Sequence, residues 1–423
     1  MALSDSYVAI TRLIIERSTG ERLSSGTASD LISLNAANWN QLYEVADSHD
    51  LVPLVYQGVL SLGPIDKLEP HIFPFKQKYE LNGKRNHILR DELLYLVKEL
   101  RQRDIEILPY KEPLSFSLRQ PDIGIRQFKD IDFLIDQDDL DGIYSVLESL
   151  GFRLEQPLRC FRNQCYERFA KDYSFVRSTG RTTGQPIPDV RGSDREKAGW
   201  LIIEPHWSIA ANRIAVQLPF RELKTRLVSA DYHGEPINLL SPEDAHLVAC
   251  VVGSKSEWRS LRLIADVAAS VEEFPSLDWE WCLEKAKEAR ALRMFLLGNL
   301  LAARIAAAKI PESIYDRAVR DEIVADVAKD IQANILEDSF PIRADPRRFS
   351  QQIFALRENR KDRLHYLFGT FTTPRVADLR RLPLPGSLYF IHCFISPLME
   401  YLVRPAVRCL RSLLRAIRSV GLR

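Results

Sequence analysis

The apolar residues of this chain change their spacing twice, and the changes predict three kinds of region. In residues 1–103 they recur every three or four positions, as Ile10, Leu13 and Ile14 do, which is typical of helices that pack by one face. The last of these helices is expected at 82–103, with an apolar side that packs and a charged side that faces water. Residues 1–103 are therefore predicted to form an N-terminal helical region.

Short runs with β-like spacing follow this region. Strands are predicted at 131–135, 173–177 and 200–207, because each is a short apolar run bounded by polar residues. A helix is expected at 138–150, where the spacing of three and four returns and a glycine follows the end. The polar stretch 178–199 has Gly, Pro and Thr but no apolar period, so it is predicted to be a hairpin insertion, either a lid over a substrate or an elaborated loop.

Helical spacing returns at Ser241, which is expected to cap a helix with Pro242 at its first position. Helices are predicted through 241–337, and 338–423 is predicted to be a C-terminal helical tail with a basic amphipathic end. The chain as a whole is therefore expected to have an α+β fold, with a small mixed sheet in 104–240 between helical regions.

The composition limits the classes of protein to which the chain can belong. With 423 residues it is long enough for two or three domains. A net charge of +1 and 46% hydrophobic residues exclude general disorder and attraction of the whole molecule to nucleic acid. The six cysteines form no CxxC pair, and the N-terminus has no cleavage site of a signal peptide, so we expect a reduced, cytoplasmic protein.

The C-terminal tail combines an apolar segment with a run of arginines. The apolar segment 388–403 is shorter than the roughly 20 residues that span a bilayer, and it contains Pro397 and Glu400, so a transmembrane helix is not expected. The basic helix predicted after it is open to three interpretations: core packing with a solvated basic face, peripheral contact with the inner membrane surface, or binding of another anionic partner. Its arginines recur every three or four residues: Arg404, Arg408, Arg411, Arg415 and Arg418.

Candidate chemistry begins with two carboxylates on the predicted strand 131–135 and just before it. Asp130 and Asp132 are two positions apart, so their side chains point to one face about 7 Å apart and repel by about 2 kcal/mol at an effective dielectric of 20. A wet edge strand would explain such a pair, and so would a bound cation. Glu204 lies in the apolar run WLIIEPHW, where a carboxylate for solubility is not expected, and Arg126 is placed to contact a phosphate.

Three carboxylates on neighbouring strands are suited to Mg²⁺, which takes oxygen ligands and is held by carboxylates together with substrate phosphates. Two such ions can activate an attacking hydroxyl and stabilise a leaving pyrophosphate. This pattern favours nucleotidyl transfer.

Longer stretches of the chain strengthen this interpretation. The segment LPYKEPLSFSLRQPDIGIRQFKDIDFLIDQDDLDGIYSVLESLGF, followed by LIIEPHWSI, resembles the bacterial uncharacterised nucleotidyltransferase family of the DNA polymerase beta superfamily. The stretches NWNQLYEVADSHDLVPLVYQGVL and LSPEDAHLVACVVGSKSEWRSLRLIADVA are similar to other parts of that family. The resemblance implies a polymerase beta-like core and a Mg²⁺-dependent or Mn²⁺-dependent enzyme. It would transfer a nucleoside monophosphate from an NTP donor to a hydroxyl of a small molecule, an RNA end or a protein.

The resemblance also implies roles for single residues. Asp130, Asp132 and Glu204 would be the catalytic metal ligands. His206 and Trp207 match the family pattern as residues beside the site, because Mg²⁺ prefers oxygen to the nitrogen of an imidazole. The residues expected to contact the nucleotide phosphates are Lys111, Arg126 and Lys255.

One position departs from the family. Where the family has glycine after the lysine, this chain has Glu112, which adds a negative charge beside the expected triphosphate. The departure keeps a second hypothesis open, a nucleotide-binding or assembly protein of the same fold with little or no turnover. No run of aromatic and basic residues marks a track for DNA, and the acceptor is not identified.

Overall fold

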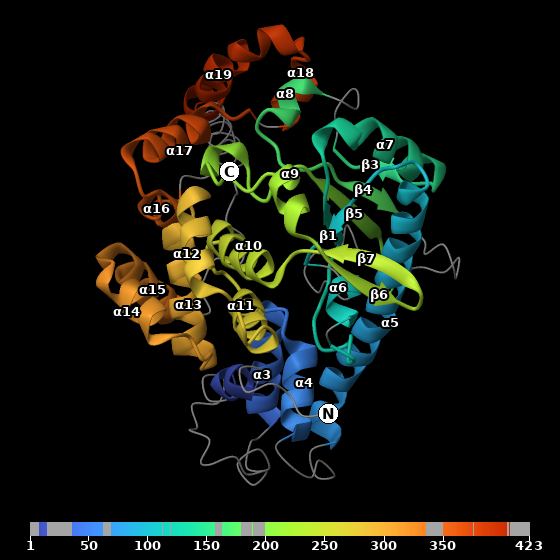
Figure 1. The fold of residues 1–423 in the computed structure, drawn as a ribbon, viewed down its shortest axis with the longest axis vertical. Helices are drawn as coiled ribbons and strands as arrows, with labels where there is room; N and C mark the ends of the chain where they lie inside the picture. Colours follow the sequence, from blue (N-terminus) through green and yellow to red (C-terminus); the bar gives the residue numbers. More distant parts are fainter. Residues whose placement is uncertain are drawn as a thin grey trace, which may run out of the picture.

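The computed structural model describes residues 8–14, 36–61, 69–111, 113–118, 120–156, 163–178, 188, 199–335, 350–374, 376–403 and 406 (Figure 1). Three predictions from the sequence concern residues that lie wholly or mostly outside these ranges: Glu112, the polar insertion at 178–199 and the basic segment after residue 403. Among the described residues, no helix has both the length and the apolar character needed to cross a membrane.

The N-terminal helical region is present, and its last helix is longer than expected. Residues 8–14 are helical, and they are followed by α3 (Ala36–Ser48), α4 (Val52–Ser61) and α5 (Glu69–Arg101). The expected start of α5 at residue 82 is wrong, because the helix begins at Glu69 and contains Pro74. Proline near a helix start removes few hydrogen bonds, so Pro74 does not break α5.

The polar side of α5 is not entirely in water, which corrects a second expectation. Asn82, Arg85 and Asn86 are completely buried. Their side chains donate hydrogen bonds mainly to backbone carbonyls of the loop that leads into the sheet, so these donor groups are paired without being solvated. The accepting carbonyls are those of Ile123, Gly124 and Arg126 for the two asparagines, and of Phe128 and Lys129 for Arg85, which also donates to Pro188 and Trp200.

A small mixed sheet lies beside α5, as predicted, with the strand order β1-β2-β5-β4-β3 (Figure 1). Only the β2–β5 pair is parallel, and the other pairs are antiparallel. The three predicted strands are confirmed as β2, β4 and β5, each slightly shorter than expected. The strands are β1 (Leu108–Pro109), β2 (Ile131–Leu134), β3 (Arg153–Leu154), β4 (Phe175–Arg177) and β5 (Leu201–His206).

One face of the sheet packs on α5 and on α7 (Leu140–Ser149), the helix expected at 138–150. Ile131 and Phe133 of β2 share a buried core with Leu93 of α5 and Ile143 of α7. Side chains alternate along a strand, so Asp132 points to the opposite face. The apolar packing of β2 therefore fixes the direction of its carboxylate.

The second half of the chain is helical, as predicted, apart from a hairpin that precedes it. The antiparallel pair β6 (Val228–Tyr232) and β7 (Glu235–Leu239) was not predicted. Ser241 caps the following helix, as expected, by accepting a hydrogen bond from the backbone of Asp244 at 3.2 Å. The helices are α10 (Pro242–Lys255), α11 (Leu261–Glu273), α12 (Trp279–Glu288), α13 (Leu292–Ala306), α14 (Glu312–Arg320) and α15 (Glu322–Asn334).

A single apolar core joins the N-terminal helices to the helices that follow the sheet. Trp39 of α3 and Val55 of α4 belong to the same buried cluster as Leu247 of α10 and Phe295 of α13. A second core holds the later part of α5 and most of the sheet, while Ile72 and Phe75 at the start of α5 belong to the first core. The division of the chain at residues 103, 240 and 337 stays a prediction.

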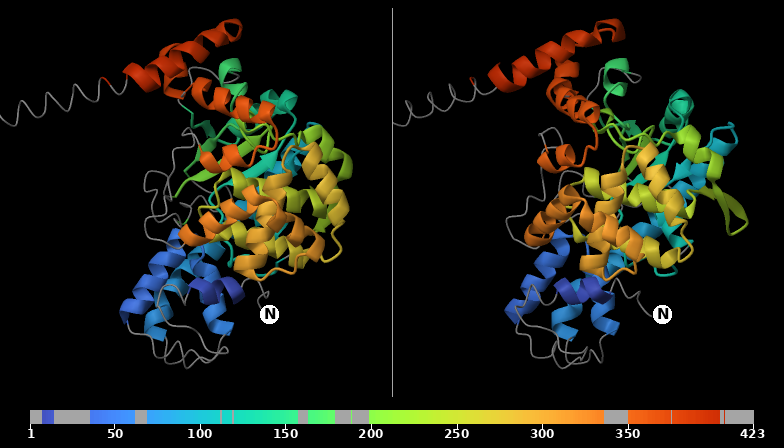
Figure 2. Two further views of the ribbon diagram at one scale, coloured as in Figure 1. Left: turned by 90° about the vertical axis from the view of Figure 1, so that its left-hand side faces the viewer. Right: turned by 60° about the vertical axis from the view of Figure 1, so that its left-hand side comes forward.

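The described chain ends in helices that extend beyond the main body (Figure 2). We call residues 360–403 the C-terminal arm. It is preceded by α16 (Gln351–Ala355) and consists of α17 (Arg360–Thr372), α18 (Val376–Arg381), α19 (Tyr389–Leu398) and the π-helical turn Met399–Val403. The arm is attached to the body by α17, which contacts residues 212–214, and by α18, which contacts α8 (Gln164–Glu167). Within the arm, α17 contacts α19.

Candidate functional site

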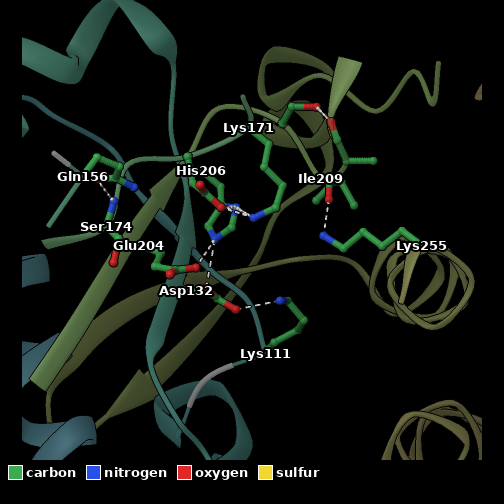
Figure 3. Close-up of polar contacts among 12 residues, drawn as sticks. Lys111, Asp132, Gln156, Lys171, Ser174, Glu204, His206, Ile209 and Lys255 are labelled. Atoms are coloured by element: carbon green, nitrogen blue, oxygen red, sulfur yellow. Dashed lines mark hydrogen bonds and ion pairs between the residues drawn. The ribbon is translucent and has the colours of Figure 1, made fainter. Parts of the chain in front are cut away.

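The parallel pairing of β2 and β5 brings two of the predicted carboxylates together. Asp132 lies directly opposite Glu204 in the register of the two strands. His206 is two residues beyond Glu204 and therefore points to the same face. One ligand atom from each of these three residues lies within 4.8 Å of the other two (Figure 3). We call Asp132, Glu204 and His206 the carboxylate cluster.

Asp132 is buried and is contacted on both of its oxygens. His206 Nε2 lies 2.9 Å from Oδ1, and Lys111 Nζ lies 2.6 Å from Oδ2. The second carboxylate is farther away, with Glu204 Oε2 3.6 Å from His206 Nε2. Lys111 has a φ of +55°, a left-handed conformation that is unfavourable for a lysine, and its ammonium contacts Asp132 from this backbone position.

Two residues that the sequence analysis missed complete the surroundings of His206. Lys171 Nζ lies 3.3 Å and Asp172 Oδ2 lies 3.4 Å from His206 Nδ1. An isolated bridge between the backbones of Asp172 and His206 places both residues beside the end of β5. The only signal in the sequence was a charged pair just before an apolar strand, which is also a common sequence for a loop.

The charges of the carboxylate cluster are strongly coupled. Burial alone would raise the pKa of Asp132, but the Lys111 ammonium and the hydrogen-bonded His206 hold that pKa well below its usual value. Burial also acts against ionised Glu204, but the contact with His206 lowers the pKa of Glu204. Burial and the nearby Lys171 lower the pKa of His206, so both carboxylates are ionised and the imidazole is neutral near pH 7.

Three lysines come to this region from separate parts of the chain (Figure 3). Lys111 precedes α6 (Pro113–Ser117), Lys171 precedes β4, and Lys255 ends α10. Burial, followed by the charges of Lys171 and Lys111, holds the pKa of Lys255 well below its usual value. Burial also lowers the pKa of Lys171. Each of these positive charges disfavours the others, so a bound polyanion would stabilise the charged form of the lysines.

Lys255 is also tied to the main chain, since its ammonium donates a hydrogen bond to the carbonyl of Ile209. The contact holds the end of α10 against the segment that follows β5. The predicted phosphate contact of Lys255 stays a prediction, and its side chain lies in the same region as Lys111 and Lys171 (Figure 3).

Arg126 contacts a carboxylate of the helical half, and its predicted contact with a phosphate stays a prediction. Its guanidinium forms a two-bond ion pair with Asp266 of α11, at 2.7 and 2.8 Å, and lies over the ring of Phe128. Burial would raise the pKa of Asp266, but the charge of Arg126 lowers it. This pair joins the loop before β2 to the helical half, and a phosphate would have to share the guanidinium with Asp266.

The remaining predicted residues are distributed around the cluster. Asp130 is half-buried just before β2 and is not one of the three residues within 4.8 Å of one another. Two positions along a strand are about 7 Å, so its carboxylate does not coincide with that of Asp132. Trp207 packs beside Tyr173, with ring centroids 5.4 Å apart. Glu112 lies outside the described residues.

A largely apolar pocket lies next to Lys111, between the sheet region and helices α10 and α11. Its volume, counting the open mouth, is about 880 Å³. Phe116 and Phe128 line one side, and Ala249 of α10 and Leu263 of α11 line another. Apolar pockets with a few charged groups at one end are typical sites for small organic ligands. The charged groups here are Lys111, Arg126, Asp266 and Glu273.

The donor atoms of the cluster are suited to a divalent metal ion. Asp132 and Glu204 offer carboxylate oxygens, the ligands that Mg²⁺ and Mn²⁺ favour, whereas His206 offers a nitrogen that Mg²⁺ does not favour. If His206 Nε2 bound a metal, the proton of the neutral imidazole would reside on Nδ1. The Nδ1–H group would then point to the Asp172 carboxylate as a hydrogen-bond acceptor. The residues present therefore fit a metal held mainly by two carboxylates.

Comparisons with known proteins agree with this chemistry. No curated protein and no solved structure matches the chain. Residues 35–307, which are 273 of the 423 residues, match the model of a family described as "Uncharacterised nucleotidyltransferase". The match includes the sheet, the carboxylate cluster and helices α10 and α11, and it confirms the resemblance seen in the sequence. The chain therefore belongs to this family of nucleotidyltransferases.

Proposed function

We propose that this protein is a metal-dependent nucleotidyltransferase that moves a nucleoside monophosphate from an NTP to a hydroxyl of an acceptor. One observation carries the proposal: Asp132 and Glu204 lie opposite each other on the two parallel strands, with three lysines around them. Carboxylates in this position would hold Mg²⁺ or Mn²⁺, and the ion would stabilise negative charge on the phosphates. Asp130 is proposed as a further ligand, and the five-stranded sheet as a polymerase beta-like core.

The lysines would bind the triphosphate. Lys111 and Lys171 contact residues of the carboxylate cluster, and Lys255 reaches the same region from α10. The Lys111 ammonium contacts Asp132, so its positive charge lies beside the residues that would hold the metal and could pair with a phosphate oxygen there.

The proposed reaction transfers a nucleoside monophosphate to the acceptor hydroxyl. The acceptor oxygen forms a new bond to the α-phosphorus, and the bond between that phosphorus and the bridging oxygen of the β-phosphate breaks. Pyrophosphate leaves, and the hydroxyl proton passes to water. The side chains of this protein act by orienting the phosphates and by placing positive charge beside the leaving group. We propose the apolar pocket beside Lys111 as the place where the organic part of a substrate binds.

A second function, nucleotide binding without turnover, is favoured by one feature of the site. Lys111 Nζ lies 2.6 Å from Asp132 Oδ2, a position that a metal ion would otherwise compete for. Glu112, beside it in the sequence, adds negative charge where the family has glycine. Under this alternative, calorimetry would detect nucleotide binding and no pyrophosphate would be released. Glu112→Gly would raise turnover in an enzyme that is impaired at this residue alone.

The main proposal is tested by incubating the purified protein with labelled NTPs, Mg²⁺ or Mn²⁺ and a cell extract as the source of acceptor. Asp132→Asn should lower label transfer by at least about a hundredfold, because it removes a charged ligand at the reacting phosphates. Asp138→Asn is the matched control, since Asp138 is an exposed aspartate shortly after the same strand. Transfer that survives Asp132→Asn would rule out the proposed metal ligand.

A further inference from the structure

Exposed apolar side chains are concentrated on the C-terminal arm. Among the described residues, fourteen large apolar side chains are exposed, and ten of them lie between 364 and 403. The most exposed is Phe394, at 73%, and Phe368 is exposed at 67%. Single exposed apolar residues are common on protein surfaces, but a concentration of this size indicates a surface that binds something.

The spacing of these residues places them along particular sides of their helices. Phe390, Phe394 and Leu398 follow one another at intervals of four on α19, so they lie along one side of it. Leu364 and Phe368 do the same on α17. Figure 2 shows that α19 projects away from the body, and the exposure of Phe390, Phe394 and Leu398 shows that this side of α19 is not covered by the described helices.

The charge of the chain is divided unevenly, and the arm is at its positive end. Residues 360–423 contain twelve Lys or Arg and three Asp or Glu, whereas residues 1–359 contain 46 and 54. The last part of the chain therefore carries a formal charge of +9, and the rest carries −8. Arg380 and Arg381 of the arm are exposed, while Asp362 and Asp378 are buried, so the arm presents positive charge to its surroundings.

We propose that the C-terminal arm binds the surface of an anionic lipid bilayer. Exposed Phe and Leu side chains would enter the boundary between headgroups and acyl chains, and the exposed arginines of the arm would meet the anionic headgroups. An apolar contact and a basic contact together give stable binding where either one alone is weak. The proposal does not depend on nucleotidyl transfer.

The charge and the apolar surface of the arm favour a bilayer over two other binding partners, a second copy of the chain and nucleic acid. A symmetric contact between two copies would bring two segments of net positive charge together, which is electrostatically unfavourable. Nucleic acid would satisfy the arginines, but it offers no apolar phase for exposed phenylalanine and leucine side chains. An anionic bilayer surface satisfies both requirements.

The test is flotation of the full-length protein with vesicles of phosphatidylcholine alone or of phosphatidylcholine mixed with phosphatidylglycerol. The protein should float with the anionic vesicles, and added salt should weaken this binding. The double variant Phe390→Ser, Phe394→Ser should lower the affinity about tenfold or more, because binding scales with the apolar area buried. Phe73→Ser is the matched control, since Phe73 is similarly exposed, at 56%, but lies on α5 outside the arm.

Several results would overturn the proposal. One is failure to float with anionic vesicles, and another is an equal loss of binding in Phe73→Ser. A third is a concentration-dependent dimer, measured by light scattering, that the double variant abolishes while vesicles bind neither protein. Binding to RNA in place of vesicles, with no effect of the double variant, would also overturn it. Circular dichroism of each variant checks that the fold is kept.

Discussion

Two groups of buried polar side chains lie near β2, and they differ in what they contact. On α5, the donors of Asn82, Arg85 and Asn86 point to backbone carbonyls of the loop before β2. In the carboxylate cluster, Asp132 and Glu204 point toward other side chains, and their main partners are His206 and the lysines.

The difference separates a structural role from a chemical one. A backbone carbonyl is a fixed, neutral partner, so the α5 donors hold the loop in one shape and have no further capacity to exchange partners. Side-chain partners with coupled charges can be exchanged for a metal ion or a phosphate. Burial of polar groups alone therefore does not identify a site, and the identity of their partners does.

The largest effect that separates the two groups is expected for Arg85→Met. The change leaves the carbonyls of Phe128 and Lys129 without this donor, and each unpaired buried group costs about 1–3 kcal/mol, so the free energy of unfolding should fall by about 3 kcal/mol. Denaturation in urea measures it. Lys84→Met, an exposed position on the same helix, should change stability by less than about 0.5 kcal/mol. Equal losses in the two variants would contradict a special role for Arg85.

A smaller effect, dependent on pH, is expected for Lys111→Met. The depressed pKa of Asp132 means that its ionised form contributes stability above the pKa of the unfolded chain, and this stability is lost as pH falls through the folded pKa. Without Lys111 the pKa of Asp132 rises, so the loss of stability on acidification should begin at a higher pH.

Urea unfolding of Lys111→Met at a series of pH values measures this shift. At neutral pH the loss of stability should be about 1.5–3 kcal/mol, typical of a hydrogen bond to a charged group. Lys98→Met, which removes a half-exposed lysine paired with Glu235, should cost at most about 1 kcal/mol and should not change the pH at which stability is lost in acid. If stability is lost at the same acidic pH in Lys111→Met as in the unchanged protein, this lysine does not control the pKa of Asp132.

The smallest effect is expected in the apolar pocket. Ala249→Leu adds apolar volume to the wall of the pocket, and its effect should appear in the KM of the substrate that binds there, raised about tenfold with little change in kcat. Steady-state kinetics with varied NTP and varied acceptor would show which substrate this is. Ala325→Leu on α15, also half-buried but outside the pocket, is the control. No change in either KM would remove the pocket from the substrate site.

The sequence was sufficient for the elements that local pattern controls. The apolar alternation around Phe133 and the apolar run before Glu204 predicted β2 and β5, and Ser241 predicted the start of α10. The hairpin of β6 and β7 could also have been predicted. His233 and Gly234 both have positive φ and form its two-residue turn, and a His-Gly pair between two alternating strands is a sequence signal for such a turn.

Long-range contacts account for what the sequence did not predict. Asn82 and Arg85 look the same in a sequence whether they face water or a backbone carbonyl, so their burial was not predicted. Lys171 reaches His206 through the return of the chain to β4 and β5, and no local spacing encodes that contact. The same is true of the Arg126–Asp266 pair, which joins two halves of the molecule.

The parallel register of β2 and β5 also determines how this site can vary without being lost. Asp132 meets Glu204 through strand pairing, so the chain between the two strands can lengthen or shorten while the distance between the carboxylates stays the same. A slip of β5 by a single residue is different, because it would turn Glu204 away and present an isoleucine or a proline in its place. The site therefore tolerates large insertions in its loops and no insertion in its strands.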